Sequence, residues 1–221
     1  MDFDFSPIFD NWGFLAQGLW ITIELSVATM VAATLVGIAL GLGRIYGPAW
    51  LRVPLTFYVD SMRAIPVLVV LVWTFFAFPL LTGITLPPFW AALAALTLHI
   101  AAFVSEILRA GLASIRPGQV RAARALGMSG AQIVRKILFP QAVVRMLPAY
   151  GSLLSVTIKD TAIASVIAVP ELMRQSETIS AQTFRPIEVF TTAMLVYFLI
   201  LFPVTRAVEA FYRRVAHLGR S

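Results

Sequence analysis

Five long apolar stretches limit this chain to a narrow range of folds. Each is about twenty residues or more, the length that an α-helix needs to cross the hydrocarbon core of a bilayer. In lipid the backbone must satisfy its own hydrogen bonds, and a helix does so along its own length. The sequence therefore predicts an all-α integral membrane protein with five transmembrane helices. The predicted spans are 19–42, 55–80, 89–113, 147–169 and 187–212.

The composition agrees with this class of protein. The chain is 59% hydrophobic and 13% charged, with a mean hydropathy of +0.86, which is typical of membrane proteins. The net charge of +6 does not indicate a nucleic-acid partner, because the basic residues gather at the ends of apolar runs. The absence of cysteine excludes disulfides and thiolate metal sites. With no linker or low-complexity tract, residues 1–221 are interpreted as one transmembrane domain.

The distribution of basic residues predicts the orientation of the bundle. Most of them lie in the connectors after the first and third spans and in the C-terminal tail, whereas the opposite side has only Arg174 and Arg185. Since cytoplasmic loops carry the excess of Lys and Arg, the N-terminus is expected outside and the C-terminus in the cytoplasm. Residues 1–10 are acidic and have no basic n-region, so the first span is expected to act as an uncleaved insertion signal.

The connector between the third and fourth spans contains the start and stop signals of two short helices. Pro117 suits a first helical turn, and Gly127 suits a left-handed stop. Ser129 and Gln132 have the spacing of a capping box, and Pro140 is predicted to end the second helix. A helix-glycine-helix unit at the mouth of a membrane bundle is suited to bind a soluble partner.

This connector resembles the coupling loop of importer-type ABC permeases. The family pattern is EAA-x3-G-x9-I-x-L-P, and the chain reads RAA-x3-G-x9-I-x-F-P from Arg121 to Pro140. Arg121 reverses the charge of the usual Glu, whereas Phe139 conserves the volume of the usual Leu. The resemblance implies a cytoplasmic coupling loop at 117–140. Its implied contacts with an ATPase are Gln119, Arg121, Ala122, Ala123, Gly127 and Pro140.

Other segments are similar to permeases of the polar amino acid family. Residues 105–111 match its S-E-x-x-R-x-G pattern, and residues 159–161 match its K-D-T, although Ala162 and Ile163 replace the usual Ser-Leu. The likeness extends from the first span to Tyr212. It implies an ATP-driven amino acid importer of the bacterial inner membrane. The implied partners are an ABC ATPase dimer, a second permease subunit, identical or paralogous, and a periplasmic or extracellular solute-binding protein.

No catalytic or cofactor site is expected in this chain. It contains no G-x-x-x-x-G-K-[ST] phosphate loop, so ATP hydrolysis is expected to belong to another subunit and the chain is not predicted to be an enzyme. The two histidines, His99 and His217, fall in different regions, which argues for neither a metal site nor a Ser-His-Asp arrangement.

Ionisable residues inside the spans identify a candidate substrate path. Lys159 and Asp160 lie in the fourth span, where each charge costs at least a few kcal/mol without a partner. A zwitterionic amino acid offers both partner charges, and a structural ion pair to another span is the alternative. Thr157 and Thr161 flank the pair, and His99 in the third span contacts either a ligand or a backbone carbonyl.

Further polar residues of the spans are expected to have structural or gating roles. Glu106 and Arg109 have i,i+3 spacing and are predicted to form a gating or structural pair. Arg206 and Glu209 have the same spacing. Pro66 is expected to kink the second span or to start a helix within it.

The sequence leaves the substrate and two other protein classes open. Segments 1–9 and 175–178 are similar to glutamate/aspartate permeases, which favours acidic amino acids, with basic amino acids, opines and ectoine-like solutes as alternatives. A secondary transporter is less compatible, because five spans do not divide into two equal repeats. An integral-membrane enzyme would need a catalytic constellation.

Overall fold

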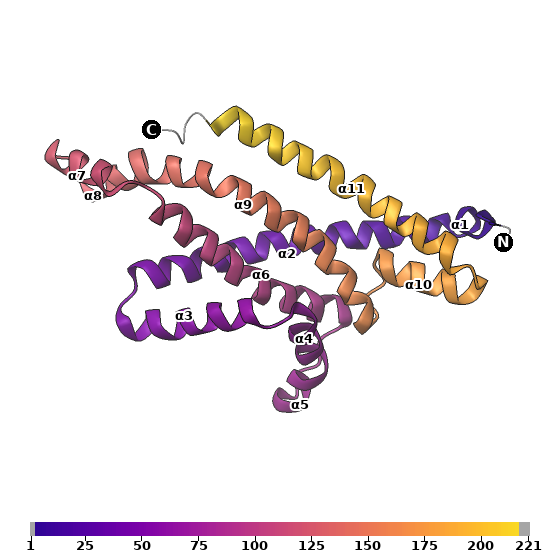
Figure 1. The fold of residues 1–221 in the computed structure, drawn as a ribbon. Helices are drawn as coiled ribbons and strands as arrows, with labels where there is room; N and C mark the ends of the chain where they lie inside the picture. Colours follow the sequence, from indigo (N-terminus) through magenta and orange to yellow (C-terminus); the bar gives the residue numbers. More distant parts are fainter. Residues whose placement is uncertain (1–2, 217–221) are drawn as a thin grey trace.

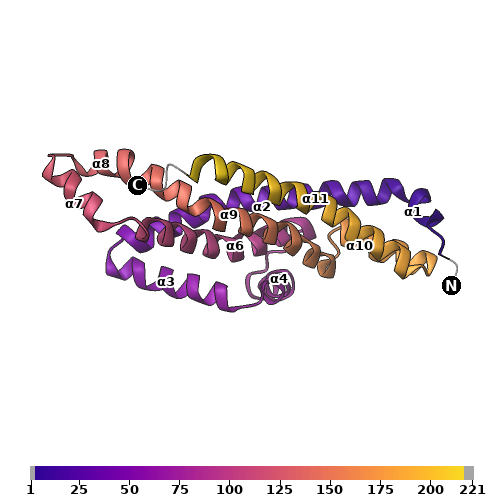
Figure 2. The ribbon, with the colours of Figure 1, turned by 45° about the horizontal axis from the view of Figure 1, so that its top comes forward.

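Residues 3–216 are described by a computed structural model, and these residues form an elongated bundle of helices without strands (Figures 1 and 2). The short helices α7 and α8 lie at one end of the bundle, and α1 and α10 lie at the other (Figure 1). The helices are α1 (Ser6–Asp10), α2 (Trp12–Tyr46), α3 (Ala49–Ala64), α4 (Val67–Val72), η1 (Trp73–Ala77), α5 (Phe78–Thr82), α6 (Pro88–Ala113), α7 (Pro117–Ala125), α8 (Gly130–Ile133), η2 (Val134–Leu138), α9 (Phe139–Asp160), η3 (Thr161–Ile167), α10 (Leu172–Thr183) and α11 (Pro186–Val215).

The predicted number of spans is confirmed when a bent helix pair is taken as one span. Within residues 3–216, four helical segments are long and apolar enough to cross a membrane, and the pair Ala49–Ala64 with Val67–Thr82 supplies the fifth. All five segments begin before the predicted apolar runs, and the fourth does so by the largest margin, at Gly130 instead of residue 147. The four unbroken segments are Trp12–Tyr46, Pro88–Ala113, Gly130–Ile167 and Pro186–Val215.

The second span, predicted for 55–80, is broken at Pro66. The two halves of the span are bent by 109°. Ile65 adopts an extended conformation, as expected for a residue whose helical geometry is disfavoured by the following proline. Beyond the break, α4 and α5 turn away from the other helices (Figure 1). The expectation of a kink or a helix start at Pro66 is confirmed.

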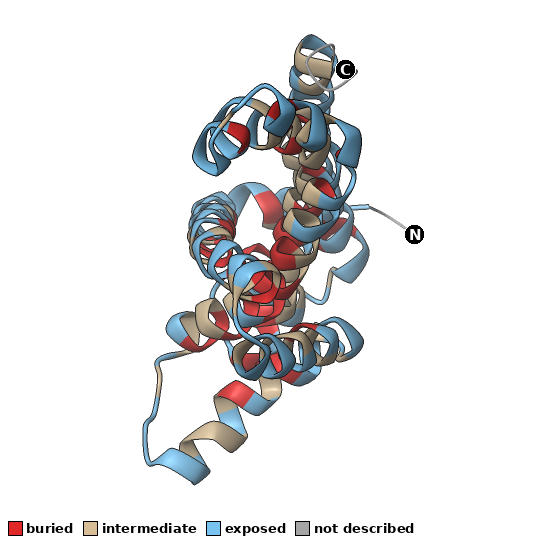
Figure 3. Cartoon of the chain, turned by 90° about the vertical axis from the view of Figure 1, so that its left-hand side faces the viewer, coloured by how far each residue is buried: buried red, intermediate tan, exposed pale blue. Residues whose placement is uncertain are grey.

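The centre of the bundle is the close contact between α2 and α6. An ideal Cβ on Gly37 would come within 2.5 Å of the Val104 Cβ atom and 2.7 Å of the Ala101 carbonyl oxygen. Small residues on α6 continue this contact, since Ala91, Ala92, Ala95, Ala101 and Ala102 are all buried. The buried positions gather along the middle of the bundle in the end-on view (Figure 3). The backbones of α2 and α6 therefore approach closely because the residues between them are small.

Pro140 does not end the second short helix, which corrects the sequence prediction. Instead α8, η2, α9 and η3 form one helical segment from Gly130 to Ile167. The turn before the proline is π-helical, with the Phe139 N–H bonded to the Val134 carbonyl. A proline removes one backbone donor and crowds the carbonyl four residues earlier. We infer that the wider π-helical turn accommodates the proline within the helix.

Replacing Gly37 with alanine is expected to destabilise the α2–α6 contact. The new methyl group would overpack against Val104, an effect that typically costs about 1–3 kcal/mol. Gly13 is the matched control, because it lies in the same helix and has no heavy atom within 4 Å of its ideal Cβ. Thermal unfolding in detergent should show a lower Tm for Gly37→Ala than for Gly13→Ala. Equal Tm values would contradict the tight contact.

Candidate functional site

A groove between α9 and α11 carries polar side chains along an otherwise apolar surface. It has a volume of about 480 Å³. Lys159 lies in it, exposed, together with the hydroxyls of Ser152, Ser155 and Thr205. Glu209 is also in the groove and is neutralised by two arginines of its own helix, Arg206 at 3.1 Å and Arg213 at 2.7 Å. The predicted Arg206–Glu209 pair is thus confirmed. Within residues 3–216 no ion pair to Lys159 is present.

The spacing of these groove residues puts them on one face of α9. Pro148, Ser152, Ser155 and Lys159 follow at intervals of four, three and four residues, the repeat that aligns side chains along a helix. The two serines were not predicted, although this repeat, followed backwards from Lys159, points to them. Lys159 and Asp160 are the last two residues of α9, directly before η3.

The structure does not bring the other proposed path residues into this groove. Thr157 and Thr161 are fully buried, and their hydroxyls donate to the Leu153 and Ile158 carbonyls of the same helical segment at 2.9 and 2.8 Å. Asp160 is partly buried. His99 is buried on α6, with its ring centroid 5.2 Å from that of Phe103, and its Nδ1 has no hydrogen-bond partner within the described residues. Of the five proposed residues, the groove contains Lys159.

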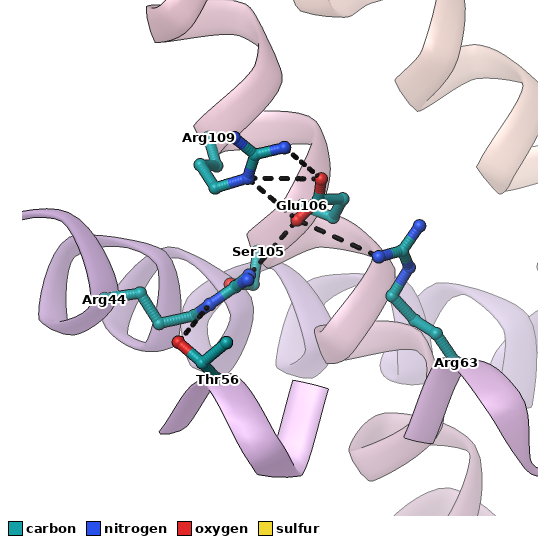
Figure 4. A network of polar contacts seen from close by, with 6 residues as sticks. All are labelled: Arg44, Thr56, Arg63, Ser105, Glu106 and Arg109. Atoms are coloured by element: carbon teal, nitrogen blue, oxygen red, sulfur yellow. Dashed lines mark hydrogen bonds and ion pairs between the residues drawn. The ribbon is translucent and has the colours of Figure 1, made fainter. Parts of the chain in front are cut away.

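A charged network joins α2, α3 and α6 near the α7–α8 end of the bundle (Figure 4). The Glu106 carboxylate lies 2.5 Å from Arg109, 3.2 Å from Arg44 and 3.9 Å from Arg63. Arg44 also donates to the Ser105 hydroxyl at 3.3 Å, and its side chain is 7% exposed. The predicted Glu106–Arg109 pair is present. Arg44 and Arg63 were missed, because pairs between helices leave no fixed spacing in the sequence.

The coupling-loop residues form the first predicted short helix, α7, and the start of the second, α8. Gly127 has φ = +73°, and the helix ends with bonds from the Met128 N–H to the Ala123 carbonyl and from the Gly127 N–H to the Arg124 carbonyl. This is the Schellman arrangement that favours glycine. The predicted capping box is also present, with the Gln132 N–H donating to the Ser129 hydroxyl and the Ser129 N–H donating to the Gln132 side chain.

The predicted ATPase contacts fall into two groups in this loop. Ala122, Arg121 and Pro140 are exposed, whereas Ala123 is buried within the chain. Gln119 is half-buried and bonds to the Gln141 amide at 2.9 Å, which ties α7 to the start of α9. The exposed surface of α7 and α8 is therefore available to a partner, while Ala123 and Gln119 hold the loop in shape.

A buried carboxylate fixes the other end of the bundle. Glu171 is fully buried and caps α10, accepting hydrogen bonds from two backbone N–H groups of its first turn at 2.9 and 2.7 Å and from the Tyr197 hydroxyl at 3.0 Å. Burial raises the pKa of Glu171 to about 7, although these hydrogen bonds act to lower it. The neighbouring Leu172 N–H donates to the Thr22 hydroxyl of α2 at 3.1 Å. Glu171 thus joins α10 to α11, and Leu172 joins it to α2.

The helical bundle, the broken span and the exposed short helices α7 and α8 are those of a membrane permease of the ABC importer class. Residues 33–217 match the family described as "Binding-protein-dependent transport system inner membrane component", and the chain belongs to this family. In a crystal structure titled "Crystal structure of an amino acid ABC transporter with histidines", one chain superimposes with a TM-score of 0.91 and 31% identity, covering 97% of this chain and 100% of that one.

Curated relatives are permease proteins of several amino acid transport systems. The octopine transport system permease protein OccM of Rhizobium meliloti is 34% identical over 91% of this chain and 86% of its own. The arginine transport system permease protein ArtQ of Bacillus subtilis is 34% identical over 97% and 98%. The glutamine transport system permease protein GlnP of Escherichia coli K12 is 31% identical over 97% and 99%.

Glu106→Gln is expected to destabilise the protein far more than Glu209→Gln. Both glutamates pair with arginines, but the Glu106 side chain is 21% exposed and faces the buried Arg44, whereas Glu209 is 46% exposed. Removing one partner of a buried pair costs up to about 3–5 kcal/mol, against about 0–1 kcal/mol for a surface pair. Chemical unfolding of both variants in detergent tests this difference. Similar losses in the two variants would show that the Glu106 network is not structurally important.

Proposed function

We propose that this amino acid importer permease conducts a solute with a free carboxylate along the α9–α11 groove, with Lys159 binding the carboxylate. The observation that carries the proposal is an exposed lysine beside hydroxyl side chains, without an ion pair in the described part of the chain. An unpaired ammonium at membrane depth is costly unless water or a ligand compensates it. The hydroxyls of Ser152, Ser155 and Thr205 donate to backbone carbonyls of their own helices, so their oxygens are left to accept hydrogen bonds from the ammonium group of an amino acid.

The proposed substrate class is a polar α-amino acid or an opine. The relatives named above belong to octopine, arginine and glutamine systems, and a further one to an L-cystine system. Glutamate and aspartate, favoured by the sequence, remain candidates within this class because they share the carboxylate on which the proposal rests. Uptake of labelled amino acids in competition with each of these solutes distinguishes them.

The open groove suggests that a second permease subunit completes the path. Lys159, Ser152 and Thr205 are exposed on the surface of this protomer, and a closed aqueous path needs an opposite wall. We propose that an identical or paralogous permease supplies that wall. An ABC ATPase dimer would bind α7 and α8, and a solute-binding protein would dock at the α10 end. The family's binding-protein dependence supports the last two partners.

The proposed topology places α7 and α8 in the cytoplasm and α10 outside. Arg121 and Arg124 on α7, with Arg135 and Lys136 on η2, put an excess of positive charge at one end of the bundle. Positive charge at this end favours a cytoplasmic position.

Single cysteines test this topology against the cysteine-free background of the chain. Thr82→Cys, at the end of α5, is expected to react with an impermeant thiol reagent in intact cells. Ser129→Cys, between α7 and α8, is expected to react only after permeabilisation. Both positions are exposed in the protomer. Labelling of Ser129→Cys in intact cells would reverse the orientation and contradict the proposed ATPase site.

Gly127→Val tests the coupling helices. A β-branched residue is strained at φ = +73°, and left-handed backbone costs about 1–2 kcal/mol for a residue with a Cβ. The ratio of correctly folded to misfolded loop should therefore fall roughly 5–30-fold, and ATPase association should fall with it. Gly130→Val is the control, because Gly130 is equally open but has no positive φ. Co-purification of the ATPase measures the effect. Undiminished association of Gly127→Val would contradict the coupling role.

Lys159→Met is expected to lower uptake while the ATPase stays bound. Loss of a charge-assisted hydrogen bond of about 1.5–3 kcal/mol predicts a roughly 10–100-fold weaker interaction with the carboxylate. Lys159→Arg, which keeps the charge, should retain part of the uptake. Ser155→Cys, in the same groove, supplies the direct measurement. Saturating substrate should slow its reaction with a thiol reagent in an uptake-competent transporter, and an unchanged rate would exclude the substrate from this groove.

A further inference from the structure

A second groove lies between α2, α6 and the η2–α9 segment, on a different face of α9 from Lys159. Its volume is about 570 Å³, and it shares no lining residue with the α9–α11 groove. The walls are hydrocarbon side chains apart from three hydroxyls and the thioether of Met146. Two of the hydroxyls, on Thr34 and Tyr150, bond to each other, and Thr34 donates to the Met30 carbonyl, so neither has a donor left for an occupant at that end. This groove, called here the α2–α9 groove, is suited to an apolar occupant.

The length of the α2–α9 groove matches one leaflet of a bilayer. Along α2 its lining residues are Thr34, Ile38, Leu42 and Tyr46, spaced four residues apart on one helical face. Twelve residues of helix correspond to about 18 Å at 1.5 Å per residue. The hydrocarbon core of a bilayer is about 30 Å thick, so one leaflet accounts for about 15 Å. An extended acyl chain lying parallel to α2 therefore fits between Thr34 and Tyr46.

Positive charge lies at the Tyr46 end of the groove. Val134 lines the groove there, and Arg135 and Lys136 follow it directly in η2. Both basic residues are exposed, and no ion pair among residues 3–216 involves either of them. Two cations beside the mouth of an apolar, leaflet-long groove complement a molecule with one acyl chain in the groove and a negative phosphate at the surface.

We propose that the α2–α9 groove binds an acyl chain of an anionic phospholipid from the leaflet at the α7–α8 end, with its phosphate beside Arg135 and Lys136. The lipid would contact η2, the π-helical turn that links α8 to α9. The site is independent of the transported solute, since it shares no residue with the Lys159 groove. A second copy of the chain in the groove, and nonselective lipid contact, are the competing occupants.

Photolabelling of the full-length chain in nanodiscs tests this proposal. The probe is phosphatidylglycerol with a diazirine near the end of one acyl chain, and phosphatidylcholine with the same chain is the neutral comparison. Mass spectrometry should locate the phosphatidylglycerol label on groove residues of α2 and α9, with a roughly 30-fold preference over phosphatidylcholine from two nearby cations at about 1 kcal/mol each. Arg135→Gln/Lys136→Gln should reduce the preference to the neutral level. The control Arg121→Gln/Arg124→Gln removes the same charge from α7 and should keep it.

A groove-filling pair of variants separates the acyl-chain contact from the charge. Val143→Trp fills the α2–α9 groove and should abolish labelling there by both lipids, whereas Val31→Trp, on an exposed part of α2 outside the groove, should not. If Val143→Trp does not yield folded protein, the exposed charge variants still decide. Equal labelling by the two lipids, or an unchanged preference in Arg135→Gln/Lys136→Gln, would overturn the proposal. If neither lipid labels the groove and the Leu42→Cys variant forms a disulfide between two copies of the chain, the groove is occupied by a second copy and the proposal is overturned.

Discussion

The close contact of α2 with α6 is the constraint on which the rest of the bundle depends. Between helices in lipid the hydrophobic effect contributes little, so association relies on close packing and on polar contacts. Gly37 allows the two backbones to approach, and the buried alanines of α6 extend the contact. The other helices are positioned against this pair: α3 and α9 pack on α6, and α10 packs on α2.

Polar contacts then fix the two ends of the packed pair. At the α7–α8 end, the Glu106 carboxylate holds arginines from α2, α3 and α6 together. At the opposite end, Glu171 joins the start of α10 to α11. Because each carboxylate binds side chains or backbone groups from more than one helix, these two residues connect helices that would otherwise need several separate pairs. Between these two ends, no ion pair within residues 3–216 joins one helix to another, and the helices there are held by packing.

Features that depend on neighbouring residues could be predicted from the sequence, whereas contacts between helices could not. Span number, the left-handed Gly127 and the Ser129 capping box depend on hydropathy or on neighbours within a few residues, and all were predicted. The 109° bend at Pro66 was anticipated only as a kink, because proline fixes a break but not the direction of the next helix. The Arg44–Glu106 contact and the buried position of Thr157 depend on how helices rotate about their axes. Composition does not encode that rotation.

The continuity of the helix from Gly130 to Ile167 has a mechanical consequence. Lys159 lies 29 residues beyond Gly130 on one rod, which corresponds to roughly 44 Å at 1.5 Å per residue. A small tilt of α8 therefore becomes a large lateral displacement at Lys159, as with the long arm of a lever. The π-helical turn at Val134–Leu138 lies directly after α8 in this segment. Flexibility of its hydrogen bonds would determine how much of the tilt of α8 reaches Lys159. The stiffness of this one turn would therefore control how strongly movement at the α8 end is coupled to movement at Lys159.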